Sequence, residues 1–191
     1  MRDEPSPKPN PMDDFQSAWY RLFLLFLAML LAVGWFVLGP NSPAYSVGVV
    51  GGTFVLGPVV AAPVMRREPR QWFRVPTCER VLHRIGGVGI FGWLLDVSGW
   101  NRHVPEPIRG FSGNKAGLHS LVQWVRTGAV SHGICFAIHL LLAVLALFTR
   151  HPWTAALWML LPGVVLHLYP VLLQRSLMFR LQPLLEKTGS C

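Results

Sequence analysis

Four apolar runs, each about 20 residues long, set the main constraint on how this chain can fold. They cover residues 19–39, 44–65, 131–149 and 153–174. An α-helix rises 1.5 Å per residue, so about 20 residues cross the ~30 Å hydrocarbon core of a bilayer. Inside lipid a helix satisfies its own backbone hydrogen bonds. We therefore predict an all-α, polytopic membrane protein with four transmembrane helices.

The charge of the chain also fits a membrane protein. Only 14% of the 191 residues are charged, whereas about a quarter are in a typical soluble domain. The net charge of +8 would suggest nucleic-acid binding in a soluble protein. In a membrane protein, Lys and Arg collect on the cytoplasmic side and meet anionic head groups. We expect membrane lipids as partners and no nucleic acid.

The remaining segments differ in composition from the four runs. Residues 1–16 are polar and Pro-rich, which predicts a disordered tail. Residues 17–185 form a single predicted membrane domain, and 186–191 form a short tail. The segment 66–130 holds ten Lys and Arg against four acids. The positive-inside rule therefore places that segment and both chain termini in the cytoplasm.

The cytoplasmic segment contains one further apolar stretch, "TCERVLHRIGGVGIFGWLLDVSGW". It is typical of a short helix, a glycine break and a second apolar piece. That second piece is too short and too glycine-rich to cross the membrane. We predict that it is interfacial or re-entrant.

Histidines inside the apolar runs are candidates for function, because polar groups are costly in lipid. His132 and His139 are seven residues apart and so share one helix face. His132 lies near the predicted cytoplasmic end, where an imidazole could act as a general base. For His139 and His167 we favour another interpretation, in which they hydrogen-bond neighbouring helices together.

Glu79 is an acidic residue in the segment that follows the predicted exit of the second run. It lies beside Arg80 and close to Arg84, so one interpretation is a solvated charged face. In the other interpretation its carboxylate orients a histidine at the mouth of the bundle. Metal chemistry is not predicted, because no metal-ligand spacing occurs among the three cysteines, Cys78, Cys135 and Cys191.

Several short motifs recur in one order along the last two thirds of the chain. They are "CERVLHRIGGVGIFGWL", "SGWN", "GFSGNKAGL", an Arg126 six residues before His132, and "LYPVLLQRSLMFRL". In this order and spacing the chain resembles the glycosyl-4,4'-diaponeurosporenoate acyltransferase family over roughly residues 75–185. Those small bacterial membrane proteins are associated with attaching a fatty acyl chain to the sugar of a carotenoid glycoside.

The resemblance implies site residues at the positions of this chain that match the family pattern. Its implied catalytic residues are His132 and Glu79. Its implied substrate-binding residues are Asn101, Lys115, Arg126, Tyr169, Gln174 and Arg175, and we add His167 as a further candidate.

The chain also departs from the family pattern at several positions. The pattern before the histidine has the form E-T-R-x-A-E-x-x-H, and Trp124 and Ala129 occupy its two acidic positions here. A lysine usual in the re-entrant piece is absent from "FGWLLDV", and His167 stands where the family tends to have Asn.

The sequence therefore predicts an acyltransferase-like protein of the bacterial cytoplasmic membrane that acts on a lipid-soluble glycoside or terpenoid. His132 would act as base with help from Glu79. Arg126 and Arg175 would bind an anionic acyl donor, either acyl-CoA or an acyl carrier, or a lipid phosphate, through their forked guanidinium groups. We expect no bound cofactor. The alternative is a non-catalytic lipid-binding or assembly protein that has lost the family's acids.

Overall fold

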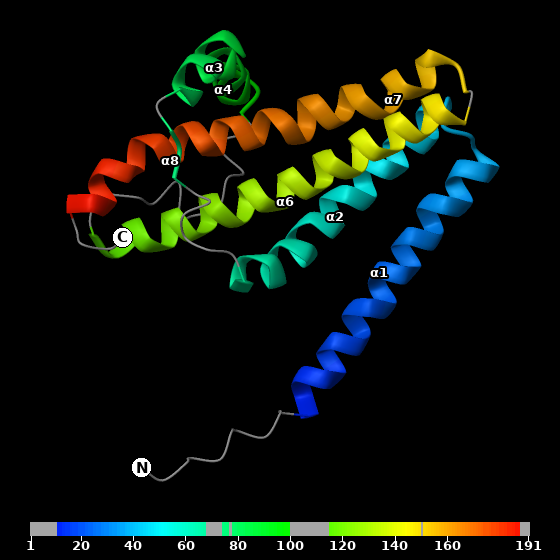
Figure 1. The fold of residues 1–191 in the computed structure, drawn as a ribbon, viewed down its shortest axis with the longest axis horizontal. Helices are drawn as coiled ribbons and strands as arrows, with labels where there is room; N and C mark the ends of the chain where they lie inside the picture. The colour runs from blue at the N-terminus through cyan, green and yellow to red at the C-terminus, as the bar shows by residue number, and fades with distance from the viewer. Residues whose placement is uncertain (1–10, 68–73, 77, 100–114, 150, 188–191) are drawn as a thin grey trace.

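All of the regular secondary structure in the described part of the chain is helical. The computed structural model describes residues 11–67, 74–76, 78–99, 115–149 and 151–187. Four of its helices are long and apolar enough to cross a membrane, which confirms the predicted fold class. Figure 1 shows the arrangement of the helices. In chain order the elements are α1 (Pro11–Val37), α2 (Pro43–Arg67), α3 (Glu79–Ile85), α4 (Val88–Val97), α6 (Lys115–Phe148), α7 (Trp153–Gly163), the π-helical turn η3 (Val164–Leu168) and α8 (Tyr169–Lys187).

The four apolar spans begin close to their predicted starts, with one exception. The first, second and fourth start at Trp19, Pro43 and Trp153. The third is longer than predicted, because α6 already begins at Lys115, within the expected cytoplasmic segment 66–130. The first turns of α6 are helical because they carry a buried apolar stripe that packs against α8. The residues of this stripe are Leu118, Leu121, Val122 and Val125. The other helices also extend beyond their predicted limits, since α1 begins at Pro11 and α8 continues to Lys187.

The fourth span is one continuous rod built from α7, η3 and α8. Pro162 lies inside it and has no N–H to donate to the carbonyl of Trp158, four residues earlier. Ser46 of α2 donates its hydroxyl to that carbonyl instead, at 2.6 Å. The π-helical turn follows directly and ends just before Pro170. Such turns often occur at functional positions.

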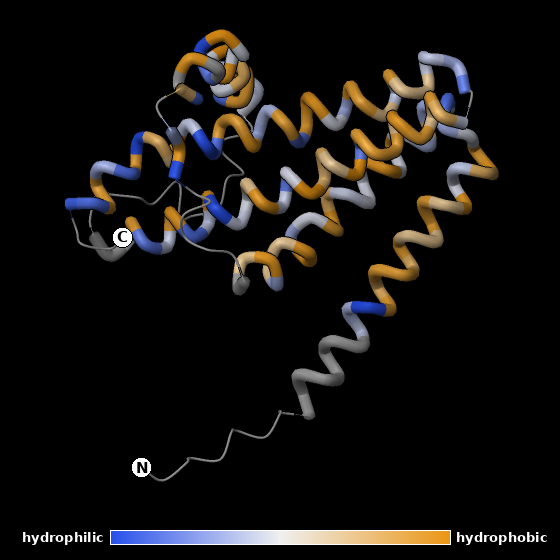
Figure 2. The backbone as a smooth tube through the Cα atoms, viewed as in Figure 1, coloured by the Kyte–Doolittle hydropathy of each residue, from blue (hydrophilic) through white to orange (hydrophobic). Residues whose placement is uncertain are grey.

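The helices pack through two buried clusters. One joins the first turns of α6 to the last turns of α8. The other is rich in alanine and lies where α2, α6 and α7 meet, as expected for helices that approach closely in lipid. Helix α1 contacts α2 but diverges from the rest, and most of its side chains are exposed. Figure 2 shows hydrophilic residues gathering on the first turns of α6 and the last turns of α8.

The expected interfacial or re-entrant segment is a pair of short helices lying beside α8 (Figure 1). Gly87 has a φ of 68° at the turn between α3 and α4, a conformation that glycine adopts without strain. The ring of Phe91 on α4 stacks on Tyr169 of α8, with ring centroids 5.1 Å apart. Helix α4 has 10 residues, about 15 Å, which is too short to cross the bilayer.

Candidate functional site

Three histidines come together inside the bundle. His132 and His139 lie on α6, and His167 lies on the π-helical turn that faces them. The ring of His167 is 5.4 Å from that of His132 and 5.3 Å from that of His139, between centroids. His139 and His167 are fully buried, whereas His132 is only partly buried. The cluster therefore has one accessible member.

A chain of hydrogen bonds lets us assign the protons of the ring nitrogens. Thr53 of α2 donates its single hydroxyl hydrogen to the carbonyl of Val50, at 2.9 Å. It must then accept a hydrogen from Nε2 of His167, which lies 3.1 Å away. In a neutral ring only one nitrogen carries a hydrogen, so Nδ1 of His167 is an acceptor. Nδ1 of His132, 3.1 Å away, is thus the donor, and Nε2 of His132 holds a free lone pair.

His139 has a different role in the cluster. Its Nδ1 donates to the carbonyl of Met159 at 2.8 Å and so joins α6 to α7. This confirms the predicted interhelical hydrogen bond. Nε2 of His139 is buried and makes no hydrogen bond in the described part of the chain.

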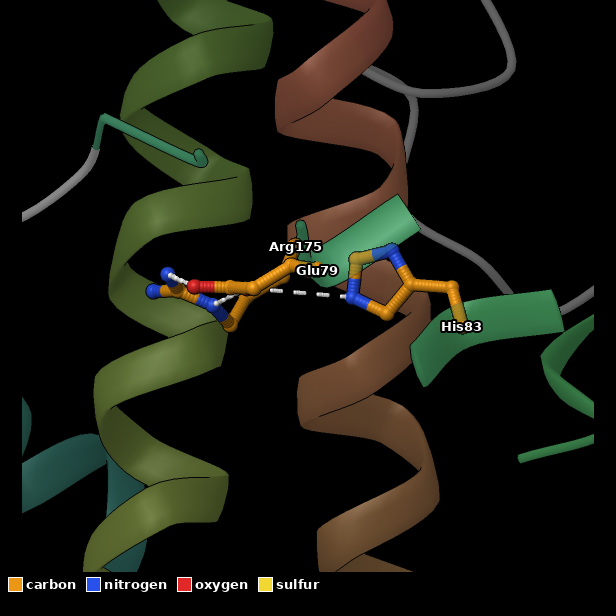
Figure 3. A network of polar contacts seen from close by, with 3 residues as sticks. All are labelled: Glu79, His83 and Arg175. Carbon is orange, nitrogen blue, oxygen red and sulfur yellow. Dashed lines mark hydrogen bonds and ion pairs between the residues drawn. The ribbon is translucent and has the colours of Figure 1, made fainter. Parts of the chain in front are cut away.

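A second polar cluster holds the short helices to the bundle. Arg175 of α8 donates two hydrogen bonds to the carboxylate of Glu79, from Nε at 2.7 Å and from Nη2 at 2.5 Å. Figure 3 shows this pair and His83, whose Nε2 lies 3.9 Å from the same carboxylate. The Arg175 guanidinium keeps the pKa of Glu79 below its ordinary value, although partial burial opposes this. Such bidentate, charge-assisted pairs are among the stronger hydrogen-bonded contacts.

The two predicted catalytic residues therefore belong to different clusters. Glu79 contacts Arg175 and His83, whereas the contacts found for His132 within the described ranges are to His167 and Phe54. Among the described residues, no carboxylate is hydrogen-bonded to His132. The neighbouring imidazole of His167 takes that place. The charge of Arg175 is matched by that of Glu79, and the contact of this arginine with an anionic donor stays a prediction.

The other predicted substrate-binding residues are spread along α6 and α8. Arg126 and Gln174 are partly buried, and a Cβ added to Gly128 of α6 would collide with the Gln174 amide, so the two helices are close there. The ring of Tyr169 stacks on the ring of Phe91. Lys115 begins α6, but its side chain lies outside the described residues, as does the whole of Asn101.

The two polar clusters can be placed by depth along the helices. Leu173 follows Trp153 by 20 residues, and Phe148 follows Gly128 by 20, so each interval covers about 30 Å. The Leu173 end of the first interval and the Gly128 end of the second lie at the same level, because Gly128 faces Gln174, the residue after Leu173. With the edge of the hydrocarbon layer placed at that level, His132, four residues from Gly128, is about 6 Å inside it and Arg175 is just outside it.

Sequence reasoning missed the residues that α2 contributes. Thr53 is fully buried and bonds His167. Phe54 lies against both facing imidazoles, with centroids 5.2 Å from His167 and 6.4 Å from His132. Thr53 could have been found from the sequence, because a hydroxyl inside an apolar span indicates a functional or structural role. Among the described residues, no group of three or more His, Cys, Asp or Glu side chains is placed to hold a metal ion.

Fold and site together define an all-helical protein with four candidate membrane spans and a buried histidine network. Residues 69–187 match the family model of glycosyl-4,4'-diaponeurosporenoate acyltransferase, so the chain belongs to that family. This confirms the resemblance found in the sequence motifs. The searches of curated proteins and of solved structures each found no match.

Proposed function

We propose that the protein transfers an acyl group to a hydroxyl of a lipid-soluble glycoside or terpenoid, with His132 as the general base. Family membership supports the reaction class. The hydrogen bond between the Nδ1 atoms of His132 and His167 supports the choice of base. It is the single observation that carries the proposal, because it leaves Nε2 of His132 with a lone pair on the accessible ring.

The proposed reaction needs only one proton carrier. Nε2 of His132 takes the proton of the acceptor hydroxyl while its oxygen attacks the carbonyl carbon of an acyl thioester. The tetrahedral intermediate then expels the thiolate of acyl-CoA or an acyl carrier. That thiolate takes the proton back from His132. The products are an ester and a free thiol, and the histidine returns to its starting state.

His167 and Thr53 are the proposed positioning residues. His167 accepts the hydrogen of Nδ1 of His132 and so keeps Nε2 unprotonated before reaction. Thr53 holds His167 in the complementary tautomer. Glu79 is assigned to holding α3 on α8 in this proposal, rather than to helping the base.

The depth of His132 suits a lipid-soluble acceptor. At about 6 Å inside the boundary, it is within reach of a hydroxyl on a molecule that stays in the bilayer. Tyr169 and Gln174 lie on the neighbouring helix and are proposed to line the acceptor path. Asn101, Lys115 and Arg126 remain the proposed contacts of the anionic donor, on the family resemblance alone.

The test measures acyl transfer in liposomes that contain the protein, a glycosylated lipid and a radiolabelled acyl-CoA. We expect activity in the unmodified protein and a loss of about 10²- to 10⁴-fold in His132→Ala. His119→Ala is the matched control, because His119 is an exposed residue of the same helix and should retain activity. Equal activity in the unmodified protein and His132→Ala would refute the proposal.

The non-catalytic alternative is supported by Trp124 and Ala129, which occupy the acidic positions of the family pattern. A protein of that kind would bind the glycosylated lipid but transfer no acyl group from any thioester. Binding without turnover in the same liposomes would favour it.

A further inference from the structure

The pair of short helices presents an apolar face away from the bundle. This α3–α4 face consists of six large side chains with exposed fractions of 51 to 79%, namely Val81, Ile85, Ile90, Trp93, Leu94 and Val97. The opposite side of the pair is buried, with Val88 in the interior and Phe91 stacked on Tyr169. The orientation of the face is therefore set by packing.

The α3–α4 pair contacts α8 at the level where we place the edge of the hydrocarbon layer. Phe91 is opposite Tyr169, and a Cβ added to Gly92 would lie 3.7 Å from Leu173. Leu173 is the residue about 30 Å along the rod from Trp153, where the hydrocarbon should end. Glu79 is tied to Arg175, two residues further on. The pair is thus held at the depth of the lipid–water boundary.

Exposed cations surround this end of the molecule. Arg84 lies on α3, and Arg74, Arg180 and Lys187 lie on or beside α8. Among the described residues at this end, the exposed acids are Asp96 and Glu186. A positive surface next to an apolar face matches an interface with anionic head groups.

We infer that the α3–α4 face is a membrane-interface surface, seated at the boundary between acyl chains and head groups of the leaflet next to Tyr169. Lipid is the occupant because the face continues the apolar outer surface of the spans at the same depth. Six exposed apolar side chains would be an unusual patch in water. The inference does not depend on acyl transfer by His132.

The test uses the full chain in nanodiscs of phosphatidylcholine and phosphatidylglycerol. Cys78 and Cys191 are replaced by Ser, while Cys135 is buried and inaccessible to labelling. A fluorescent label is then attached at Leu94→Cys, and Val81→Cys serves as a second probe if the first variant does not fold. Quenching is measured with lipids brominated on their acyl chains and with aqueous iodide.

Two exposed positions provide the reference values. Leu141→Cys lies in the last third of α6, within the third apolar run, and should report lipid, and Glu186→Cys lies near the end of α8 and should report water. We expect the Leu94→Cys label to lose intensity with brominated lipid, to shift to shorter emission wavelength, and to resist iodide, as at Leu141→Cys. Behaviour like that of Glu186→Cys would overturn the inference. Protection from both quenchers would also overturn it and would indicate a protein partner.

Discussion

The Nδ1 atoms of His132 and His167 lie 3.1 Å apart, so one ring orients the other across two helices. The donor is set by Thr53, whose only hydrogen goes to the carbonyl of Val50. An imidazole thus occupies the place where a carboxylate was expected. In this arrangement the tautomer of His132 depends on a hydroxyl of a third helix, the Thr53 hydroxyl of α2.

Replacing Thr53 by Val should reduce both stability and the proposed activity. The substitution keeps the shape but removes the acceptor of the His167 Nε2 hydrogen, which costs about 1 to 3 kcal/mol of unfolding free energy when the group is left buried. It also releases His167 to adopt the other tautomer, so that Nε2 of His132 no longer stays unprotonated. Unfolding in detergent and kcat/KM measure the two effects.

Thr53→Ser is the matched control, because it restores the hydroxyl without the methyl group. It should recover most of the activity even where stability stays lower. Equal activity in Thr53→Val and the unmodified protein would show that the hydroxyl does not position the base.

The spans and the histidines could be predicted from the sequence, but their partners could not. Length and hydropathy define a span locally, so the apolar runs were found directly. The pairing of Glu79 with Arg175 joins residues 96 apart in sequence, and it depends on where α3 rests on α8. His167 faces His132 because a π-helical turn between two prolines shifts its direction, which periodicity alone does not show.

The ion pair of Glu79 and Arg175 should make stability depend on pH. Because Arg175 lowers the pKa of Glu79 in the folded protein, the pair's contribution is fully present above the ordinary carboxyl value of 4.5. It is lost as the pH falls through the folded pKa. Thermal unfolding followed from neutral to acidic pH should show this loss, and Glu79→Gln should remove that part of the pH dependence.

A double-mutant cycle isolates the pair from other titrating groups. Glu79→Gln and Arg175→Gln should each cost about 1 to 2 kcal/mol at neutral pH, and the double variant less than their sum. Additive costs would mean that the two side chains do not interact in solution.

Gly57→Ala should force α2 away from α6. An added Cβ would collide with the hydroxyl of Ser131 and would lie 2.8 Å from Sγ of Cys135, both buried side chains. Overpacking of this kind costs about 1 to 3 kcal/mol. Gly57 lies one turn after Thr53, so the same shift should lengthen the hydrogen bond to His167 and lower the proposed acyl transfer.

Gly51→Ala is the matched control on the same helix. An added Cβ there meets nothing within 4 Å, and alanine is favoured over glycine in a helix by about 0.5 to 1 kcal/mol. We therefore expect opposite signs for the two substitutions in the unfolding free energy measured in detergent. A stabilising Gly57→Ala would mean that α2 and α6 are further apart at this level, and the link from Thr53 to His167 would lose its structural support.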